Sequence, residues 1–234
     1  MKNLKQAGIL LILLALPALL FLFLRNSGKN HYSIGRYYPV IDSTSGQVKV
    51  GKQIIKGKEI IDTLFHTVPD FELINQDGKQ VKGASLKGKV VVADFFFTRC
   101  PGMCKKMSSQ MTRVQERFIN NPEIQIVSFS VDPRNDTVPA LRNYADMYDI
   151  KTEKWQLLTG DKPQIYRLAK YGYFVTAKEN DPVAQNLEDQ FVHTDKFVLV
   201  DKGGVIRGYY NGTNRKDVDR LITEIDILLQ EYEQ

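Results

Sequence analysis

Two long apolar runs constrain the fold of this chain more than any other feature. Lys89–Phe97 (KVVVADFFF) is a nearly continuous run of apolar, β-branched and aromatic residues, which predicts a strand covered on both faces. Glu123–Val131 (EIQIVSFSV) is rich in the same residue types and predicts a second buried strand. Between them, apolar side chains recur at the spacing of one helical face: Met107, Met111, Val114 and Phe118. A helix that joins two buried strands favours their parallel pairing in a sheet with helices on its faces.

Further elements continue this α/β pattern on both sides of the two runs. They are a hairpin at 71–75 and 80–82 around Asp77-Gly78, helices at 139–148 and 162–171, a hairpin at 197–200 and 205–210, and a last helix capped by Asn214. This order of elements predicts a thioredoxin-like α/β fold over residues 66–234.

The amino-terminal segment is a candidate membrane anchor. Ala7–Leu24 is a run of 18 residues without a charge, and a helix of that length spans about 27 Å, just enough for a bilayer core. A cleavable signal peptide is the alternative, but no A-x-A-like site follows the run. Residues 1–29 are therefore expected to form a single uncleaved transmembrane helix with its flanking charges. Residues 30–65 are expected to form a tether and an irregular, hairpin-like β extension.

The position of the basic residues excludes nucleic acid as a partner. The chain of 234 residues has a net charge of +5, but Lys2, Lys5, Arg25 and Lys29 flank the apolar run, where no acidic residue occurs. The remainder is nearly neutral and lacks the basic surface that binds DNA or RNA. Paired carboxylates, a glycine-rich phosphate loop, HExxH and GxSxG are all missing from the sequence, so we do not expect a conventional enzyme.

The two cysteines are the main candidate functional residues. They lie directly after the first apolar run, in Cys100-Pro101-Gly102-Met103-Cys104, where we expect a helix to begin with Pro101 at its first position. Backbone N–H groups and the helix dipole favour a thiolate there, and residues at i and i+4 share one helical face. The alternatives are a structural disulfide or two inert thiols. We favour a functional pair because the chain has no other cysteine.

Ligand chemistry favours copper at this pair. Two thiolates select Cu(I), zinc or an iron–sulfur cluster, but structural zinc and clusters usually need four protein ligands, whereas Cu(I) accepts three. His31, His66 and His193 are the candidates for the third ligand. We favour His193 because it ends a polar loop just before the strand expected at 197–200, a junction that adjoins the cysteines in a thioredoxin fold. Among the methionines, only Met103 is kept as a neighbour of the site.

Several short sequence motifs lie within residues 66–232. They are Val68-Pro69-Asp70-Phe71, Leu86-Lys87-Gly88-Lys89-Val90-Val91, Phe97-Thr98-x-Cys100-Pro101-x-x-Cys104, Ser130-Val131-Asp132-Pro133 with Asp136-Thr137, Trp155-x-Leu157-Leu158-Thr159-Gly160, and His193 before Phe197–Asp201. In these motifs the chain resembles the Sco/SenC family of copper-binding, thioredoxin-fold assembly factors for cytochrome c oxidase.

The resemblance implies a membrane-anchored copper metallochaperone. Cys100, Cys104 and His193 would bind copper, as Cu(I) and also as Cu(II). They would deliver it to the dinuclear copper centre in the copper-receiving subunit of cytochrome c oxidase, or reduce the cysteines of that centre. The soluble domain would lie on the periplasmic side of a bacterial cytoplasmic (inner) membrane. The chain differs from the family at Lys105, where proline is frequent, and at Val192, where aspartate is frequent.

A thiol–disulfide oxidoreductase of the extracytoplasmic space is the alternative function. Cys100 and Cys104 would then be the redox pair, with a thiol reductant as a further partner and no role for His193 in exchange. Peroxidase chemistry is disfavoured because one residue, not two, separates Thr98 from Cys100. Copper delivery and thiol–disulfide exchange can coexist in one protein. Only the dithiol form binds Cu(I), and oxidation to the disulfide would release the ion.

Overall fold

The structure is a computed structural model that describes residues 2–27, 32–55, 58–175 and 194–233. The chain divides into two units, residues 1–33 and residues 34–234. The first contains one helix, α1 (Lys2–Ser27), with Pro17 inside it, as expected from the sequence. Among the residues that the structure describes, no helix is both long enough and apolar enough to cross a membrane. The assignment of residues 1–29 as a transmembrane anchor therefore stays a prediction.

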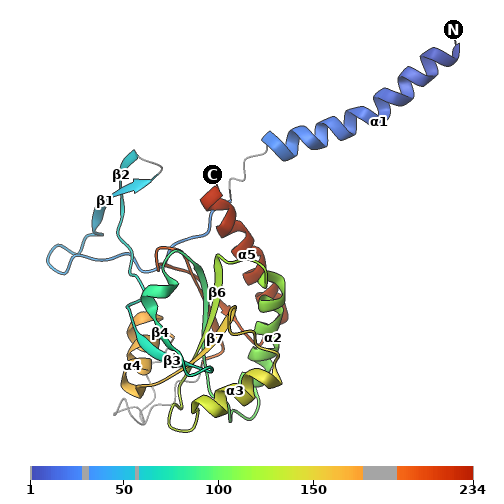
Figure 1. Ribbon diagram of the computed structural model, residues 1–234. Helices are drawn as coiled ribbons and strands as arrows, with labels where there is room; N and C mark the ends of the chain where they lie inside the picture. The colour runs from blue at the N-terminus through green and yellow to red at the C-terminus, as the bar shows by residue number, and fades with distance from the viewer. Residues whose placement is uncertain (1, 28–31, 56–57, 176–193, 234) are drawn as a thin grey trace. The chain divides into compact units, whose positions relative to one another are not determined.

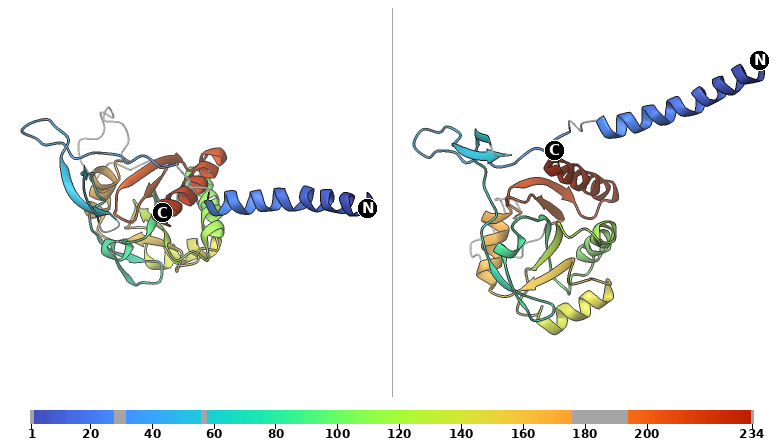
Figure 2. Two further views of the ribbon diagram at one scale, coloured as in Figure 1. Left: turned by 90° about the horizontal axis from the view of Figure 1, so that it is seen from above. Right: turned by 45° about the horizontal axis from the view of Figure 1, so that its top comes forward.

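The second unit is built around a seven-stranded mixed sheet with the strand order β4-β3-β7-β6-β5-β8-β9. Figures 1 and 2 show the strands with helices packed on them. The strands are β3 (Glu72–Asn75), β4 (Gln80–Lys82), β5 (Val90–Phe96), β6 (Ile124–Ser130), β7 (Trp155–Thr159), β8 (Lys196–Val200) and β9 (Ile206–Asn211). β5, β6 and β7 are parallel, and β3 and β8 flank them antiparallel. The parallel pairing expected of the two apolar runs is confirmed.

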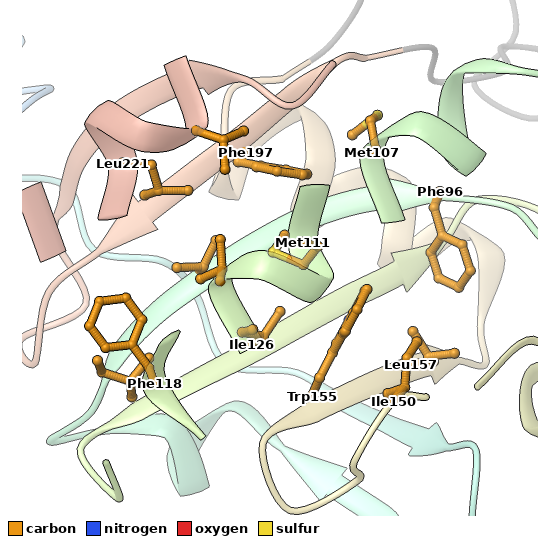
Figure 3. Close-up of a cluster of buried hydrophobic side chains, with 14 of the residues drawn as sticks. Phe96, Met107, Met111, Phe118, Ile126, Ile150, Trp155, Leu157, Phe197 and Leu221 are labelled. Atoms are coloured by element: carbon orange, nitrogen blue, oxygen red, sulfur yellow. The ribbon is translucent and has the colours of Figure 1, made fainter. Parts of the chain in front are cut away.

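Helices cover both faces of this sheet and form two cores. α2 (Met103–Phe118), α3 (Val138–Met147) and α5 (Arg215–Glu233) line the first core, which Figure 3 shows. α4 (Lys162–Arg167) and the π-helical turn Leu168–Gly172 line the second. β5 serves both, since Val92 and Phe96 lie in the first core whereas Ala93 and Phe95 lie in the second. A strand between two cores has no solvent-facing side, which explains why its sequence is apolar throughout.

One strand of the sheet is not predicted by the sequence pattern. β7 has only five residues, WQLLT, and no alternation or turn signal that sets it apart from a loop. Its place comes from tertiary pairing: Trp155 lies opposite Ile126 of β6, and Thr159 lies opposite Ile74 of β3. It thereby joins the first hairpin to the parallel centre. The other expected helices and hairpins are confirmed within a few residues, and Asn214 caps α5 by accepting from the backbone N–H of Lys216 at 2.9 Å.

The segment that precedes the sheet contains a hairpin, as expected. β1 (Val50–Ile55) and β2 (Lys58–Thr63) form a separate two-stranded antiparallel sheet. Short contacts join this extension to the main sheet, including a hydrogen bond from the Tyr37 N–H to the Ile206 carbonyl at 3.0 Å and a bridge between Thr67 and Val205.

A buried arginine fixes the beginning of this extension. Arg207, 5% exposed, donates to the carbonyl oxygens of Ile34 at 2.6 Å and Gly35 at 3.1 Å. The same guanidinium pairs with Asp201 at 3.3 Å and Glu231 at 2.7 Å. It therefore joins the extension, the turn after β8 and the end of α5 in one network.

Loss of this guanidinium should destabilise the domain strongly. We expect Arg207→Met to lower the free energy of unfolding by about 3 kcal/mol, because it leaves two partly buried carboxylates and two carbonyls without their donor. Urea denaturation followed by circular dichroism measures the change. The matched control is Arg117→Met, whose half-exposed pair with Asp226 should contribute less than about 1 kcal/mol. Equal effects of the two substitutions would contradict this role of Arg207.

Candidate metal centre

Cys100 and Cys104 lie where the central strand β5 passes into helix α2. The helix begins at Met103, with Gly102 as its N-cap, so Cys104 is in the first turn and Cys100 precedes the helix. The expectation that Pro101 takes the first helical position is wrong. The φ of −152° and ψ of −59° at Gly102 are not helical, and the turn through Pro101 and Gly102 brings Cys100 back over the helix start.

The two thiols nevertheless meet, as the sequence predicts. Both cysteines are free and buried, at 6% and 5% exposure. The backbone N–H of Cys104 donates to the Cys100 sulfur at 3.3 Å, and the Cys104 thiol also hydrogen-bonds to that sulfur. Two soft donors are therefore in contact without a disulfide between them.

The surroundings make the two thiols unequal. Burial acts to raise the pKa of Cys100, but hydrogen bonds from the Cys104 thiol and from the backbone N–H groups of Cys104, Gly102 and Met103 outweigh it and lower this pKa below its ordinary value. Burial and the hydrogen bond to Cys100 both raise the pKa of Cys104. Cys100 is thus the more acidic of the two thiols and the one that forms a nucleophilic thiolate more readily, whereas Cys104 holds its proton more tightly.

The methionines of α2 divide as expected. Met107 and Met111 are fully buried in the first core, so they pack and do not line a site. Met103 is 39% exposed and lies between the two cysteines in the chain. It is the one thioether of this helix that solvent or a partner can reach.

The histidines do not complete a metal site within the described residues. His193, the favoured third ligand, and His31 both lie outside them. His66 is described, but its Nε2 lies 3.0 Å from the carbonyl oxygen of Gly172 and its ring meets that of Phe174, so its contacts are structural. In this part of the chain, no group of three His, Cys, Asp or Glu side chains could hold a metal ion.

A buried carboxyl group beside the cysteines was not among the predicted site residues. Asp94 is 2% exposed and accepts a hydrogen bond from the Ser128 hydroxyl, which in turn accepts one from the Trp155 indole N–H at 2.7 Å. Burial raises the pKa of Asp94 to about 7, against the opposing effect of the Ser128 hydrogen bond. The signal was present in the sequence, because Asp94 is the one acidic residue inside the apolar run Lys89–Phe97.

The chain matches the SCO1/SenC family over residues 62–230, which is most of its length. The chain belongs to the SCO1/SenC family. The resemblance seen in the sequence motifs is thereby confirmed, and with it the thioredoxin-like α/β fold.

Individual relatives agree with this membership. The SCO1 protein homolog of Bacillus subtilis is 36% identical over 171 residues, covering 72% of this chain and 86% of the relative. The structure of BsSco, described as a member of the Sco family of cytochrome c oxidase assembly proteins, is similar at a TM-score of 0.59 and 34% identity, over 71% of this chain and 95% of that one. ScoI of Bradyrhizobium japonicum, solved with copper bound, is similar at a TM-score of 0.52 and 26% identity, over 66% of this chain and 98% of that one.

The raised pKa of Asp94 predicts how stability depends on pH. The folded protein keeps the proton of Asp94 up to about pH 7, whereas the unfolded chain releases it near pH 3.8, so stability falls as pH rises between these values. Asp94→Asn removes this group, and we expect it to raise the free energy of unfolding by a few kcal/mol at pH 8 and by much less at pH 4. Urea denaturation at both pH values measures the difference. Asp226→Asn, at an exposed carboxylate of α5, is the control and should show no such gain.

Proposed function

We propose that this protein binds copper through Cys100, Cys104 and His193 and delivers it to the dinuclear copper centre of cytochrome c oxidase. The observation that carries the proposal is the contact between two free thiols at the start of α2. We include His193 as the third ligand because it lies just before β8 in the sequence and because Cu(I) accepts three ligands.

The chemistry of the donor pair fits Cu(I) as cargo. Cys100 loses its proton more readily than Cys104, and both thiols must be deprotonated before they bind the ion. The affinity for Cu(I) should therefore rise with pH. A protonated Cys104 leaves one thiolate ligand and a disulfide between the two cysteines leaves none, so either change favours release of the ion. A site whose second ligand can be withdrawn suits delivery better than permanent storage.

The relatives support both the cargo and the recipient. Copper is bound in the B. japonicum ScoI structure, and BsSco is described as belonging to a family of cytochrome c oxidase assembly proteins. We infer that the recipient is the copper-receiving subunit of that oxidase, to which the protein transfers copper or whose cysteines it reduces.

The proposed location is the periplasmic side of a bacterial cytoplasmic membrane. The uncharged run Ala7–Leu24 within α1 supports a single membrane anchor. The proposed division of the chain is an anchor at 1–29, a tether and β extension at 30–65, and the Sco/SenC domain at 66–234.

Thiol–disulfide exchange is the second candidate function, favoured by the inequality of the two thiols. Cys100 would attack a partner disulfide as the thiolate, and Cys104 would then resolve the mixed disulfide. The BsSco structure is described as showing a disulfide switch. A thiol reductant would restore the dithiol in each cycle.

Copper titration distinguishes the two functions. We expect the reduced full-length chain, in detergent and without oxygen, to bind one Cu(I), and His193→Ala to weaken binding by about a hundredfold, because one of three ligands is lost. Cys104→Ser should weaken it at least as much. Competition with a chromogenic Cu(I) chelator measures the affinities, and X-ray absorption should report two sulfur ligands and one nitrogen ligand.

His66→Ala is the matched control for copper binding, since its ring contacts Gly172 and Phe174. It should leave Cu(I) affinity within about twofold of the wild type, a difference of less than 1 kcal/mol. Unchanged affinity in His193→Ala, with the loss confined to the cysteine variants, would refute the three-ligand site and favour the exchange function.

The membrane anchor has its own test. Deletion of residues 7–24 should move the protein from the membrane fraction to the soluble fraction of the cells that express it, because it removes the whole uncharged run. Fractionation after a carbonate wash measures this. Release of the full-length chain by that wash would contradict a membrane-spanning anchor.

A further inference from the structure

A second buried carboxyl group lies beside the turn that holds the cysteines. Asp136, in the segment between β6 and α3, is completely buried. It accepts hydrogen bonds from the Thr98 hydroxyl at 2.6 Å, from the Thr98 backbone N–H at 3.1 Å and 3.3 Å to its two oxygens, and from the Ser130 hydroxyl at 2.5 Å. Among the described residues, no lysine or arginine pairs with it.

This arrangement favours a carboxyl group over an amide. The Thr98 N–H donates to both oxygens of Asp136, so an amide would place its own N–H groups against a donor. The Ser130 hydroxyl cannot easily reverse, because its oxygen already accepts the N–H of Asp132 at 3.1 Å. A buried carboxyl group that lost these donors would destabilise the fold, so its contacts with Thr98 and Ser130 hold the three residues together.

The position of Thr98 links this buried carboxyl group to the cysteines. Thr98 is the second residue after β5 and lies two residues before Cys100. In the turn between it and α2, the Cys100 N–H donates to the Phe97 carbonyl at 3.3 Å, and the Gly102 carbonyl accepts from the Lys106 N–H of the helix at 3.3 Å. The ion pair of Arg99 with Asp132 lies outside, on a side chain that is 64% exposed, and contributes little.

We propose that Asp136 is a positioning residue for the dithiol. By holding both the backbone and the hydroxyl of Thr98, it fixes the start of the cysteine turn, and so the place of the Cys100 sulfur over the first N–H groups of α2. The inference deepens the proposed function where it concerns copper, but its effect on the dithiol itself does not depend on copper.

The direction of the effect follows from the contacts of Cys100. A fixed turn keeps the Cys100 sulfur at 3.3 Å from the Cys104 N–H, which stabilises the dithiol state relative to the disulfide. A looser turn loses part of this stabilisation, so the reduction potential should fall. The ligand pair would also be less well placed for a metal ion, because misplaced supporting groups weaken metal affinity.

The test compares substitutions at both ends of the contact in the full-length chain. The dithiol is equilibrated with glutathione: two cysteine thiols become one disulfide, and glutathione disulfide takes up the two electrons and two protons to give two glutathione thiols. We expect Asp136→Asn and Thr98→Val to shift this equilibrium toward the disulfide at least tenfold, a fall of about 30 mV. Thr98→Ser, which keeps the hydroxyl, should stay within about twofold of the wild type, or less than about 10 mV.

Two controls separate positioning from general destabilisation. Leu73→Ala opens the second core, away from the cysteines, and should lower the melting temperature without moving the potential. Asp132→Asn weakens the pair with Arg99 and the hydrogen bonds from the Asn135 amide but leaves the contacts of Asp136 with Thr98 intact, and it should also leave the potential unchanged. If Asp136→Asn fails to fold, the milder Thr98→Val and Thr98→Ser pair decides. A wild-type potential in folded Thr98→Val, or in folded Asp136→Asn, would overturn the proposal.

Cu(I) affinity, measured on the same variants, tests the link to the proposed function. We expect a loss of about tenfold in Asp136→Asn. Should the wild type bind no Cu(I), the copper function fails, whereas the shift in potential still tests the role of Asp136. An affinity unchanged in Asp136→Asn together with a shifted potential would overturn the part of the proposal that concerns the metal.

Discussion

The site depends on the parallel pairing of β5 and β6 at the centre of the sheet. The register places Phe96 opposite Ser130, so both strands end together, and the Val131 N–H still donates to the Phe96 carbonyl at 2.9 Å. Because parallel strands end at the same edge, the cysteine turn and the segment that carries Asp136 must lie side by side. Residues more than thirty positions apart in the sequence thereby meet beside one thiol.

The buried polar groups near the site are unusual for strands between two cores. Asp94 and Ser128 lie on the α2 side of the sheet, within a surface otherwise formed by apolar side chains such as Val92, Phe96 and Ile126. Burial raises the pKa of Asp94 to about 7. Asp136, the second buried carboxyl group near the cysteines, accepts hydrogen bonds from three donor groups of Thr98 and Ser130. The carboxyl-terminal ends of β5 and β6 thus have two buried carboxyl groups near them: Asp94, with a raised pKa, and Asp136, which accepts hydrogen bonds on both oxygens.

Much of the fold could be predicted from the sequence because its central elements have strong periodic signals. The continuous apolar run at β5 and the four-residue spacing of Met107 and Met111 identify their structures without reference to the rest of the chain. β7 could not be found in this way, since its five residues form a strand only between β6 and β3. Pro101 was misplaced for a related reason: its preference for the first helical position is local, whereas the backbone of Gly102 bends the chain before the helix begins. The meeting of Cys100 and Cys104 was predicted, but the contact of Asp136 with Thr98 depends on strand register and is not visible in the sequence.

The contacts of Arg207 have a mechanical consequence for a domain held by its amino-terminal end. Val91 of β5 lies opposite Val200 of β8, and Val200 lies opposite Ile206. Arg207 therefore lies near the amino-terminal end of β5, and the cysteines lie beyond its carboxyl-terminal end. A pulling force applied at Ile34 would act first on the Arg207 guanidinium and on its two carboxylate partners, Asp201 and Glu231. The whole length of β5 separates these groups from the thiols. A load applied at Ile34 would therefore reach the start of β5 before it reached the sulfur atoms at the other end of that strand.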